Sequence, residues 1–294
     1  MDLIDKIKYE FQSGDRVTQL LIVNIVIFVS IYLLNAFYWI LTGTNLLPII
    51  ENSFSLPTNL NAALYKPWTL ITYMFVHIEF MHLLWNMLFF YWLGSLATTY
   101  FSNKQIVQIY LIGGIFGAIF TLLAVKFSPA LSLAQSVSMT GASAAIMAVI
   151  IAATTLGPNY NIPIFLLFNL PLWVVVSVFM LKDVYYLTQS GNAAGIISHF
   201  GGSLFGFLYV KLLQNGIDFS KCARPKPMQT RMTFEHNRQA TRTETHKEPY
   251  FQADITQEQI DTILDKIKIS GYDALTKEEK RTLREFGTPK NSKL

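Results

Sequence analysis

The sequence of 294 residues contains 23 basic and 19 acidic residues, so 14% of the chain is charged, where about 25% is usual for a soluble domain. Residues 1–215 hold only 8 Lys/Arg and 7 Asp/Glu, and residues 216–294 hold the remaining 15 and 12. A body with so few charges and so many large apolar residues cannot cover its own surface with polar groups. This excludes one soluble globule and predicts a polytopic membrane domain followed by a small polar extension.

The net charge of +4 and the single cysteine limit the kinds of molecule or metal that the chain is expected to bind. Basic residues gather beside the apolar runs and in the C-terminal extension, which suits contact with the anionic headgroups of a lipid bilayer and not with a nucleic acid. Cys222 has no second thiol to pair with and no histidine cluster nearby, so neither a disulfide nor a metal site is expected. We also predict no cofactor.

The N-terminal part of the chain predicts a retained first membrane span. Residues 1–16 have mixed charge, and their four acidic residues argue against an organellar transit peptide. The uncharged run from Val17 to about Leu41 is too long for a signal-peptide core and has no small-residue cleavage site after it. Residues 42–80 follow as a long first loop of intermediate polarity, which we expect to lie in the membrane interface.

Five more apolar runs follow the first loop, so the prediction is an all-α domain of six membrane helices over residues 17–214. The runs are about 81–100, 105–125, 136–155, 163–181 and 193–210. If the N-terminus is cytoplasmic, eight Lys/Arg near the span ends lie on the inner side and three, Lys66, Lys126 and Lys182, on the outer side. Because basic residues collect on the cytoplasmic side of membrane proteins, both termini are predicted to be cytoplasmic.

Four polar residues stand out within the predicted spans, because a bilayer penalises buried polar groups. They are His82, Asn86, Ser143 and His199. His82 and Asn86 lie four residues apart on one helical face, where they could equally well bind neighbouring helices. A serine among small residues, such as Ser143, is more often a packing position than a reactive one. An ionisable residue within a span, such as His199, is a functional candidate by default.

A shared depth links these four residues. With both termini inside, the second, fourth and sixth spans enter from the outer face, and each polar group lies within about 10 Å of that face at about 1.5 Å per residue. Gly202 and Gly206 follow His199 at i+3 and i+7, and they form a strip of small residues on nearly the same face. The small residues around Gly141 offer a matching surface. We therefore expect these two helices to pack closely enough for the Ser143 hydroxyl to reach the His199 ring.

These groups suit nucleophilic catalysis on a peptide carbonyl. Ser143 would attack the carbonyl carbon, and His199 would take its proton and return it to the leaving amine. His82, Asn86 and the backbone N–H of Ser143 would donate hydrogen bonds to the oxyanion. Asp183 is expected near the far end of the fifth span, away from this layer. The sequence therefore predicts a Ser-His dyad without a carboxylate.

Taken together, the motifs resemble those of the rhomboid family of intramembrane serine proteases. They stand in the family's order, on its second, fourth and sixth helices, as His82-x-x-x-Asn86, Gly141-Ala142-Ser143-Ala144 and His199-x-x-Gly202-x-x-x-Gly206. The resemblance covers about residues 66–211. It implies a six-helix rhomboid fold, with Ser143 as nucleophile and His199 as base. It also implies that His82 and Asn86 are donors of the oxyanion hole.

Two positions depart from the family pattern, and one further position matches it. Many members carry Trp-Arg in the first loop, where this chain has Trp68-Thr69, so the support that the arginine gives the loop is absent. Bacterial members often carry a tyrosine four residues after the serine, where this chain has Met147, whose thioether can also pack against an imidazole. His77 matches a histidine found at the end of the first loop in many members, and we expect a structural role for it.

The C-terminal extension predicts a linker and a small helical hairpin. Residues 215–253 are polar, with three prolines and little apolar periodicity. Within residues 254–294, a capping-box pattern at Thr256 precedes an apolar helical stripe, Gly271 ends that helix, and Thr276 opens a second one. We expect this hairpin to be cytoplasmic and to dock on the cytoplasmic loops, on the bilayer surface or on another protein.

The leading hypothesis is an intramembrane serine endopeptidase that cleaves single-span membrane proteins near the outer face. The alternative is a catalytically silent rhomboid-like protein that binds transmembrane clients, but such relatives lack the serine or the histidine, and this chain keeps both. A small transporter would show broken midplane segments and inverted repeats, and neither is seen. The lack of a presequence and the short soluble parts favour a bacterial inner membrane.

Overall fold

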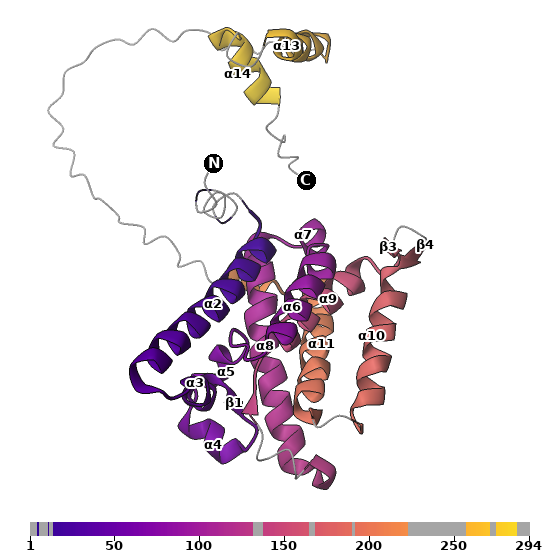
Figure 1. Cartoon of the computed structure of the whole chain (residues 1–294). Helices are drawn as coiled ribbons and strands as arrows, with labels where there is room; N and C mark the ends of the chain where they lie inside the picture. Colours follow the sequence, from indigo (N-terminus) through magenta and orange to yellow (C-terminus); the bar gives the residue numbers. More distant parts are fainter. Residues whose placement is uncertain are drawn as a thin grey trace, which may run out of the picture. The chain divides into compact units, whose positions relative to one another are not determined.

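The computed structural model describes two single residues, Asp5 and Phe11, and six continuous stretches: residues 14–131, 138–164, 168–189, 192–222, 257–270 and 275–286. The chain divides into two compact units, Met1–Met228 and Gln229–Leu294. Most of the predicted linker lies outside the described residues, as do Thr256 and Gly271. The first unit is a bundle of helices (Figure 1).

Each of the six apolar runs contains a helix in the described part of the first unit. These helices are α2 (Arg16–Thr42), α6 (Phe80–Phe89), α8 (Asn103–Phe127), α9 (Ser143–Leu156), α10 (Leu172–Tyr186) and α11 (Ala193–Gln214). The second of them continues through a π-helical turn, η1 (Phe90–Gly94), into α7 (Ala97–Tyr100). Among the described residues, four helices are long and apolar enough to cross a membrane: α2, α6 extended to Tyr100, α8 and α11. The prediction of an all-α polytopic membrane protein is confirmed.

The first loop folds into short elements that reach the start of α9. They are α3 (Leu47–Phe54), β1 (Leu56–Pro57), α4 (Leu60–Tyr65) and α5 (Thr69–Thr72). β1 pairs antiparallel with β2 (Ser138–Met139), and Leu56 lies opposite Met139. The fourth run was expected to be helical from residue 136, but this strand pairing uses its backbone groups, and α9 begins only at Ser143. The first loop is therefore tied to the segment that leads into α9.

The fifth helix also begins later than the sequence predicts. Residues of the run expected from position 163 form an antiparallel hairpin of β3 (Asn161–Ile164) and β4 (Phe168–Pro171), and α10 begins at Leu172. Pro163 and Pro171 lack a backbone N–H and so weaken any helix that would include them. The predicted start was wrong because hydropathy reports apolar composition and does not separate a short apolar strand from a helix.

α9 lies at the centre of the bundle, and α8 and α11 pack along it. The side chains from Ala144 to Ile150 are buried. A Cβ added to Gly202 would stand 2.1 Å from the carbonyl oxygen of Ala144. A Cβ on Gly206 would stand 2.2 Å from the carbonyl oxygen of Ala148. Only glycine allows two helix backbones to approach this closely, so the glycine strip seats α11 directly against α9.

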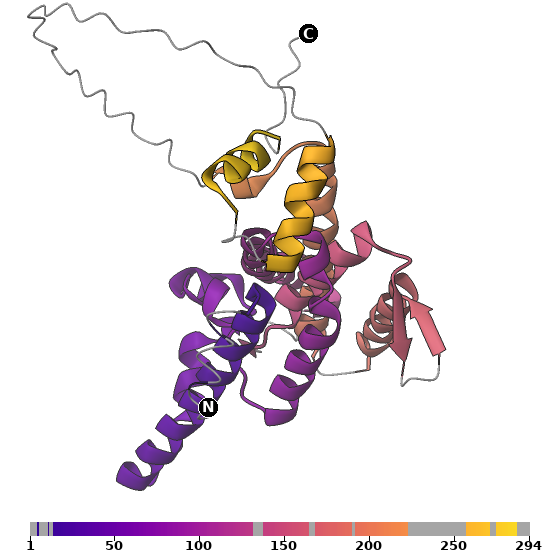
Figure 2. The ribbon, with the colours of Figure 1, turned by 90° about the horizontal axis from the view of Figure 1, so that it is seen from above.

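α10 lies at the edge of the bundle in both views (Figure 1 and Figure 2). It contacts α9 and α11 less extensively than these two helices contact one another. A short connection over residues 187–192 leads from α10 into α11. Because a short connection makes consecutive helices run in opposite directions, the last turns of α10 lie beside the first turns of α11.

The described part of the second unit holds two helices, α13 (Gln257–Ser270) and α14 (Lys277–Phe286). Thr276 and Glu279 form a capping box: the Glu279 N–H donates to the Thr276 hydroxyl oxygen at 3.2 Å, and the Thr276 N–H donates to the Glu279 carboxylate at 2.7 Å. The Lys266 ammonium group lies 2.8 Å from the same carboxylate, which joins the two helices. The hydrogen bond from Lys266 is the main reason that the pKa of Glu279 is lowered to about 2.

Gly206→Val should destabilise the membrane unit, because the added side chain would overlap the carbonyl oxygen of Ala148 and push α11 away from α9. Overpacking of this kind costs about 1–3 kcal/mol. Thermal unfolding of the detergent-solubilised protein measures the effect as a lower Tm. Leu208→Val, on the exposed side of the same helix, is the matched control and should change Tm much less. Equal Tm values for the two variants would contradict this account of the contact.

Candidate active site

Ser143 is the first residue of α9, and a glycine-dependent turn precedes it. Gly141 has φ +108°, a backbone conformation that residues with a side chain rarely adopt. A Cβ on Gly141 would also stand 2.6 Å from Cε1 of His82. Glycine is therefore needed here twice, to make the turn and to let the His82 ring lie against the backbone before the serine.

Residues of the first loop hold this turn in place. The Gly141 N–H donates to the carbonyl oxygen of Tyr73 at 2.9 Å. The Ala142 N–H donates to Nε2 of His77 at 3.3 Å. His77 is completely buried, and this burial, together with the neighbouring His82, lowers the pKa of His77 to about 4. The ring is therefore neutral at pH 7, as it must be to accept a hydrogen bond at Nε2, and it supports the turn before Ser143.

One cavity of about 800 Å³ collects five of the residues that the sequence singled out. They are His82, Asn86, Ser143, Met147 and His199. The same cavity is lined by Asp183, Lys182 and Asn192, and by a set of aromatic side chains, Trp85, Phe89, Trp92 and Phe179. Phe89 and Phe179 meet edge to face with ring centroids 4.3 Å apart, so α6 and α10 touch at one side of the cavity.

The groups expected to stabilise an oxyanion lie around Ser143. The Asn86 amide donates one of its two N–H bonds to the carbonyl oxygen of His82 at 2.9 Å, which fixes the orientation of the amide. The rings of His82 and His77 are in edge contact, with centroids 5.3 Å apart. Ser143 opens α9, where backbone N–H groups have no partner within the helix. The cavity lining thus combines the Ser143 hydroxyl with the hydrogen-bond donors of an amide, an imidazole and the backbone.

The remaining predicted residues lie outside the cavity lining. Gly202 and Gly206 lie in the contact between α9 and α11, against the carbonyl oxygens of Ala144 and Ala148. Trp68 lies in the first loop and is 49% exposed, and its indole N–H donates to the carbonyl oxygen of Ser53 at 2.8 Å. Trp68 therefore supports the first loop and does not line the cavity.

The first loop is well supported without the family's arginine. Thr69 is completely buried, and its hydroxyl donates to the carbonyl oxygen of Lys66 at 2.6 Å. The Lys66 ammonium group in turn donates to the backbone and side-chain oxygens of Asn52 at 2.6 and 2.9 Å. The departure from the family pattern at Thr69 therefore changes which residues support the loop. Hydrogen bonds from Thr69 and Lys66 still hold its segments together.

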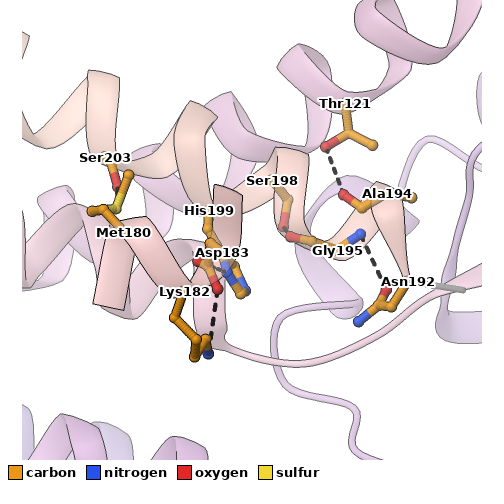
Figure 3. Close-up of polar contacts among 10 residues, drawn as sticks. All are labelled: Thr121, Met180, Lys182, Asp183, Asn192, Ala194, Gly195, Ser198, His199 and Ser203. Atoms are coloured by element: carbon orange, nitrogen blue, oxygen red, sulfur yellow. Dashed lines mark hydrogen bonds and ion pairs between the residues drawn. The ribbon is translucent and has the colours of Figure 1, made fainter. Parts of the chain in front are cut away.

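A carboxylate lies beside the candidate base, contrary to the prediction. Oδ2 of Asp183 is 2.7 Å from Nδ1 of His199 (Figure 3). Oδ1 of the same carboxylate is 3.3 Å from the Lys182 ammonium group. The Asp183 side chain is only 6% exposed and that of His199 is 19% exposed. The placement of Asp183 away from the catalytic layer was therefore wrong.

The error came from the direction of the fifth helix. α10 and α11 run in opposite directions, so the end of α10 reaches the same layer as the first turns of α11. Two signals in the sequence could have shown this. Asp183 is the only acidic residue between Glu79 and Asp218. The connection at residues 187–192 also lies about midway between Asp183 and His199.

The fold and the cavity define a class: a multi-pass helical membrane protein with a serine, two histidines and a carboxamide around one cavity. The family model of the rhomboid domain matches residues 65–215, about half of the chain, and a family of unknown function (DUF6576) matches residues 253–288. RHOMBOID-like protein 12, mitochondrial, from Arabidopsis thaliana is 27% identical over 146 residues, which is 46% of this chain and 43% of that protein. The chain belongs to the rhomboid family.

His77 should make folding sensitive to mildly acidic pH. Its pKa is lowered from 6.5 to about 4 by folding, so the unfolded chain binds a proton first, and stability falls as the pH drops from about 6.5 towards 4. The loss over this window is on the order of 3 kcal/mol. His77→Gln keeps an acceptor for the Ala142 N–H and does not titrate, so its Tm should fall less over the same pH range. The same slope in both proteins would contradict the assignment.

Proposed function

We propose that the protein is an intramembrane serine endopeptidase. The observation that carries the proposal is the convergence of Ser143, His199, His82 and Asn86 from three helices on one cavity. A rhomboid-like protein that only binds clients has no need of a hydroxyl, an imidazole and hydrogen-bond donors around the same space. Membership of the rhomboid family, which includes serine proteases, supports this reading.

In the proposed reaction, the Ser143 oxygen forms a bond to the carbonyl carbon of the substrate while its proton passes to the His199 ring. The carbonyl oxygen becomes negative and accepts hydrogen bonds from His82, Asn86 and the backbone N–H of Ser143. The carbon–nitrogen bond then breaks, and the proton moves from His199 to the leaving amine. A water molecule attacks the acyl-serine, gives a proton to His199 and releases the acid, and the serine recovers its proton.

The lining of the cavity suggests the class of substrate. Trp85, Phe89, Trp92 and Phe179 form much of its wall, and such aromatic rings suit an apolar peptide segment drawn from a bilayer. Trp85 of α6 lines the cavity and is also 64% exposed, so its ring is open to a membrane-embedded segment. We therefore propose single-span membrane proteins as substrates, cut near the outer face, with both termini of the enzyme in the cytoplasm.

A fluorophosphonate probe, which reacts with activated serines, tests the proposal. The detergent-solubilised protein should be labelled, and Ser143→Ala should abolish the labelling because the nucleophile is gone. His199→Ala should slow it by about 10²–10⁴-fold, because the base is lost. Thr140→Ala, at another hydroxyl of the cavity lining, is the matched control and should leave labelling intact. Labelling that survives Ser143→Ala, or a wild type that is never labelled, would favour the client-binding alternative.

Asn86→Ala tests the oxyanion hole separately. If the amide donates to the oxyanion, its loss should lower kcat by about 10²–10³-fold with little change in KM. The measurement is the initial rate of cleavage of a single-span substrate in detergent or liposomes. Ser203→Ala, a buried polar residue on α11 outside the cavity lining, serves as the control. A near-normal kcat in Asn86→Ala would remove the amide from this role.

A further inference from the structure

Asp183 and His199 form a short and largely buried contact between a carboxylate and an imidazole. The carboxylate and the imidazole approach to 2.7 Å, and the carboxylate is almost fully buried. A carboxylate removed from water is costly unless hydrogen bonds or opposite charges compensate for its lost hydration. Here Oδ2 faces the ring and Oδ1 faces Lys182, so both oxygens have partners (Figure 3).

The contact decides which ring nitrogen of His199 carries the proton. An ionised carboxylate can only accept hydrogen bonds, so the short contact requires a proton on Nδ1. In the neutral ring, Nε2 is then left without a proton and can act as the base. His199 lines the same cavity as Ser143, so the nitrogen left without a proton belongs to the ring that is proposed to act on the serine.

We propose that Asp183 is a positioning residue of the reaction, so that the site works as a Ser143, His199 and Asp183 triad. The proposal rests on the proposed protease function. Asp183 holds the ring through Nδ1–H and keeps Nε2 available for the serine proton. When Nε2 takes that proton, the ring becomes a cation beside the carboxylate, which stabilises it. Asp183 itself stays ionised throughout, and the proton on Nε2 moves on to the leaving amine.

Lys182 has a lesser part in this arrangement. Its side chain is 52% exposed, whereas that of Asp183 is 6% exposed, so water screens its charge strongly. Its contact with Oδ1 limits rotation of the carboxylate and leaves Oδ2 for the ring. The orientation of His199 thus depends mainly on Asp183 and on the packing of α10 beside α11.

Asp183→Asn tests the proposal because it keeps the shape of the side chain and removes its charge. We expect kcat for a single-span substrate to fall by between about tenfold and 10⁴-fold, with KM nearly unchanged, because the ring loses its tautomer control and not its substrate contacts. Asp183→Glu, which restores a carboxylate, should recover part of kcat. Val184→Ala, at the exposed neighbouring position on α10, is the control for general effects on the helix.

The outcomes separate this proposal from the proposed function. If Ser143→Ala abolishes cleavage and Asp183→Asn keeps the wild-type kcat, the enzyme is a protease and the role of Asp183 is overturned. If cleavage survives Ser143→Ala, the proposed function itself fails. If Asp183→Asn has a normal Tm and a low kcat, and Asp183→Glu recovers activity, the positioning role is supported.

A measurement on the wild type keeps the proposal testable if the variants fail to fold. Nitrogen-15 NMR of histidine-labelled protein at alkaline pH reports which ring nitrogen carries the proton, and His199→Gln identifies the resonance by its loss. The proposal predicts the Nδ1–H tautomer for His199, with its proton shifted downfield by the short hydrogen bond. A predominant Nε2–H tautomer would overturn it.

Discussion

The close backbone contact between α9 and α11 is the constraint on which the site depends. Gly202 meets the carbonyl oxygen of Ala144, and Gly206 meets that of Ala148, one turn further along both helices. Ser143 directly precedes Ala144, and His199 lies one turn before Gly202 on the same face. The two candidate catalytic side chains are thus attached immediately beside the contact. Any residue larger than glycine at these two positions would push the helices apart and separate the two side chains with them, so the proposed site depends on this packing motif.

A second constraint acts on the approach to Ser143. α9 begins after Ala142, and no side chain forms a capping hydrogen bond at its start. The first loop supplies the missing partners: β1 pairs with β2, the Tyr73 carbonyl accepts from Gly141, and His77 accepts from Ala142. A loop that the sequence predicted only as an interfacial connection therefore supports the backbone that leads into Ser143. The packing of α9 against α11 brings the segments that carry Ser143 and His199 together, and the first loop holds the turn that precedes Ser143.

Local patterns in the sequence predicted much of the fold and of the candidate site. Contacts between residues that lie far apart in the sequence account for the rest. Apolar runs located the helices, and the i, i+3, i+7 spacing of His199, Gly202 and Gly206 predicted the face on which α11 packs. The late starts of α9 and α10 depend on strand pairings that hydropathy does not encode. The support of the first loop by Lys66 and Thr69 escaped prediction for a related reason. Different side chains can satisfy the same backbone groups, so the absence of the usual arginine says little about the stability of the loop.

The membrane unit contains few charged residues, and this makes the position of the Asp183 carboxylate informative. Between Glu79 and Asp218 the chain has no acidic residue besides Asp183. A carboxylate is therefore not expected at this cavity by chance, for two reasons. Few carboxylates were available, and burial to 6% exposure penalises each one. The scarcity of charge in residues 1–215 favoured the prediction of a site without a carboxylate. The structure contradicts this expectation: the single carboxylate between Glu79 and Asp218 is buried and lies 2.7 Å from an imidazole nitrogen, and this placement supports the positioning role that we propose for Asp183.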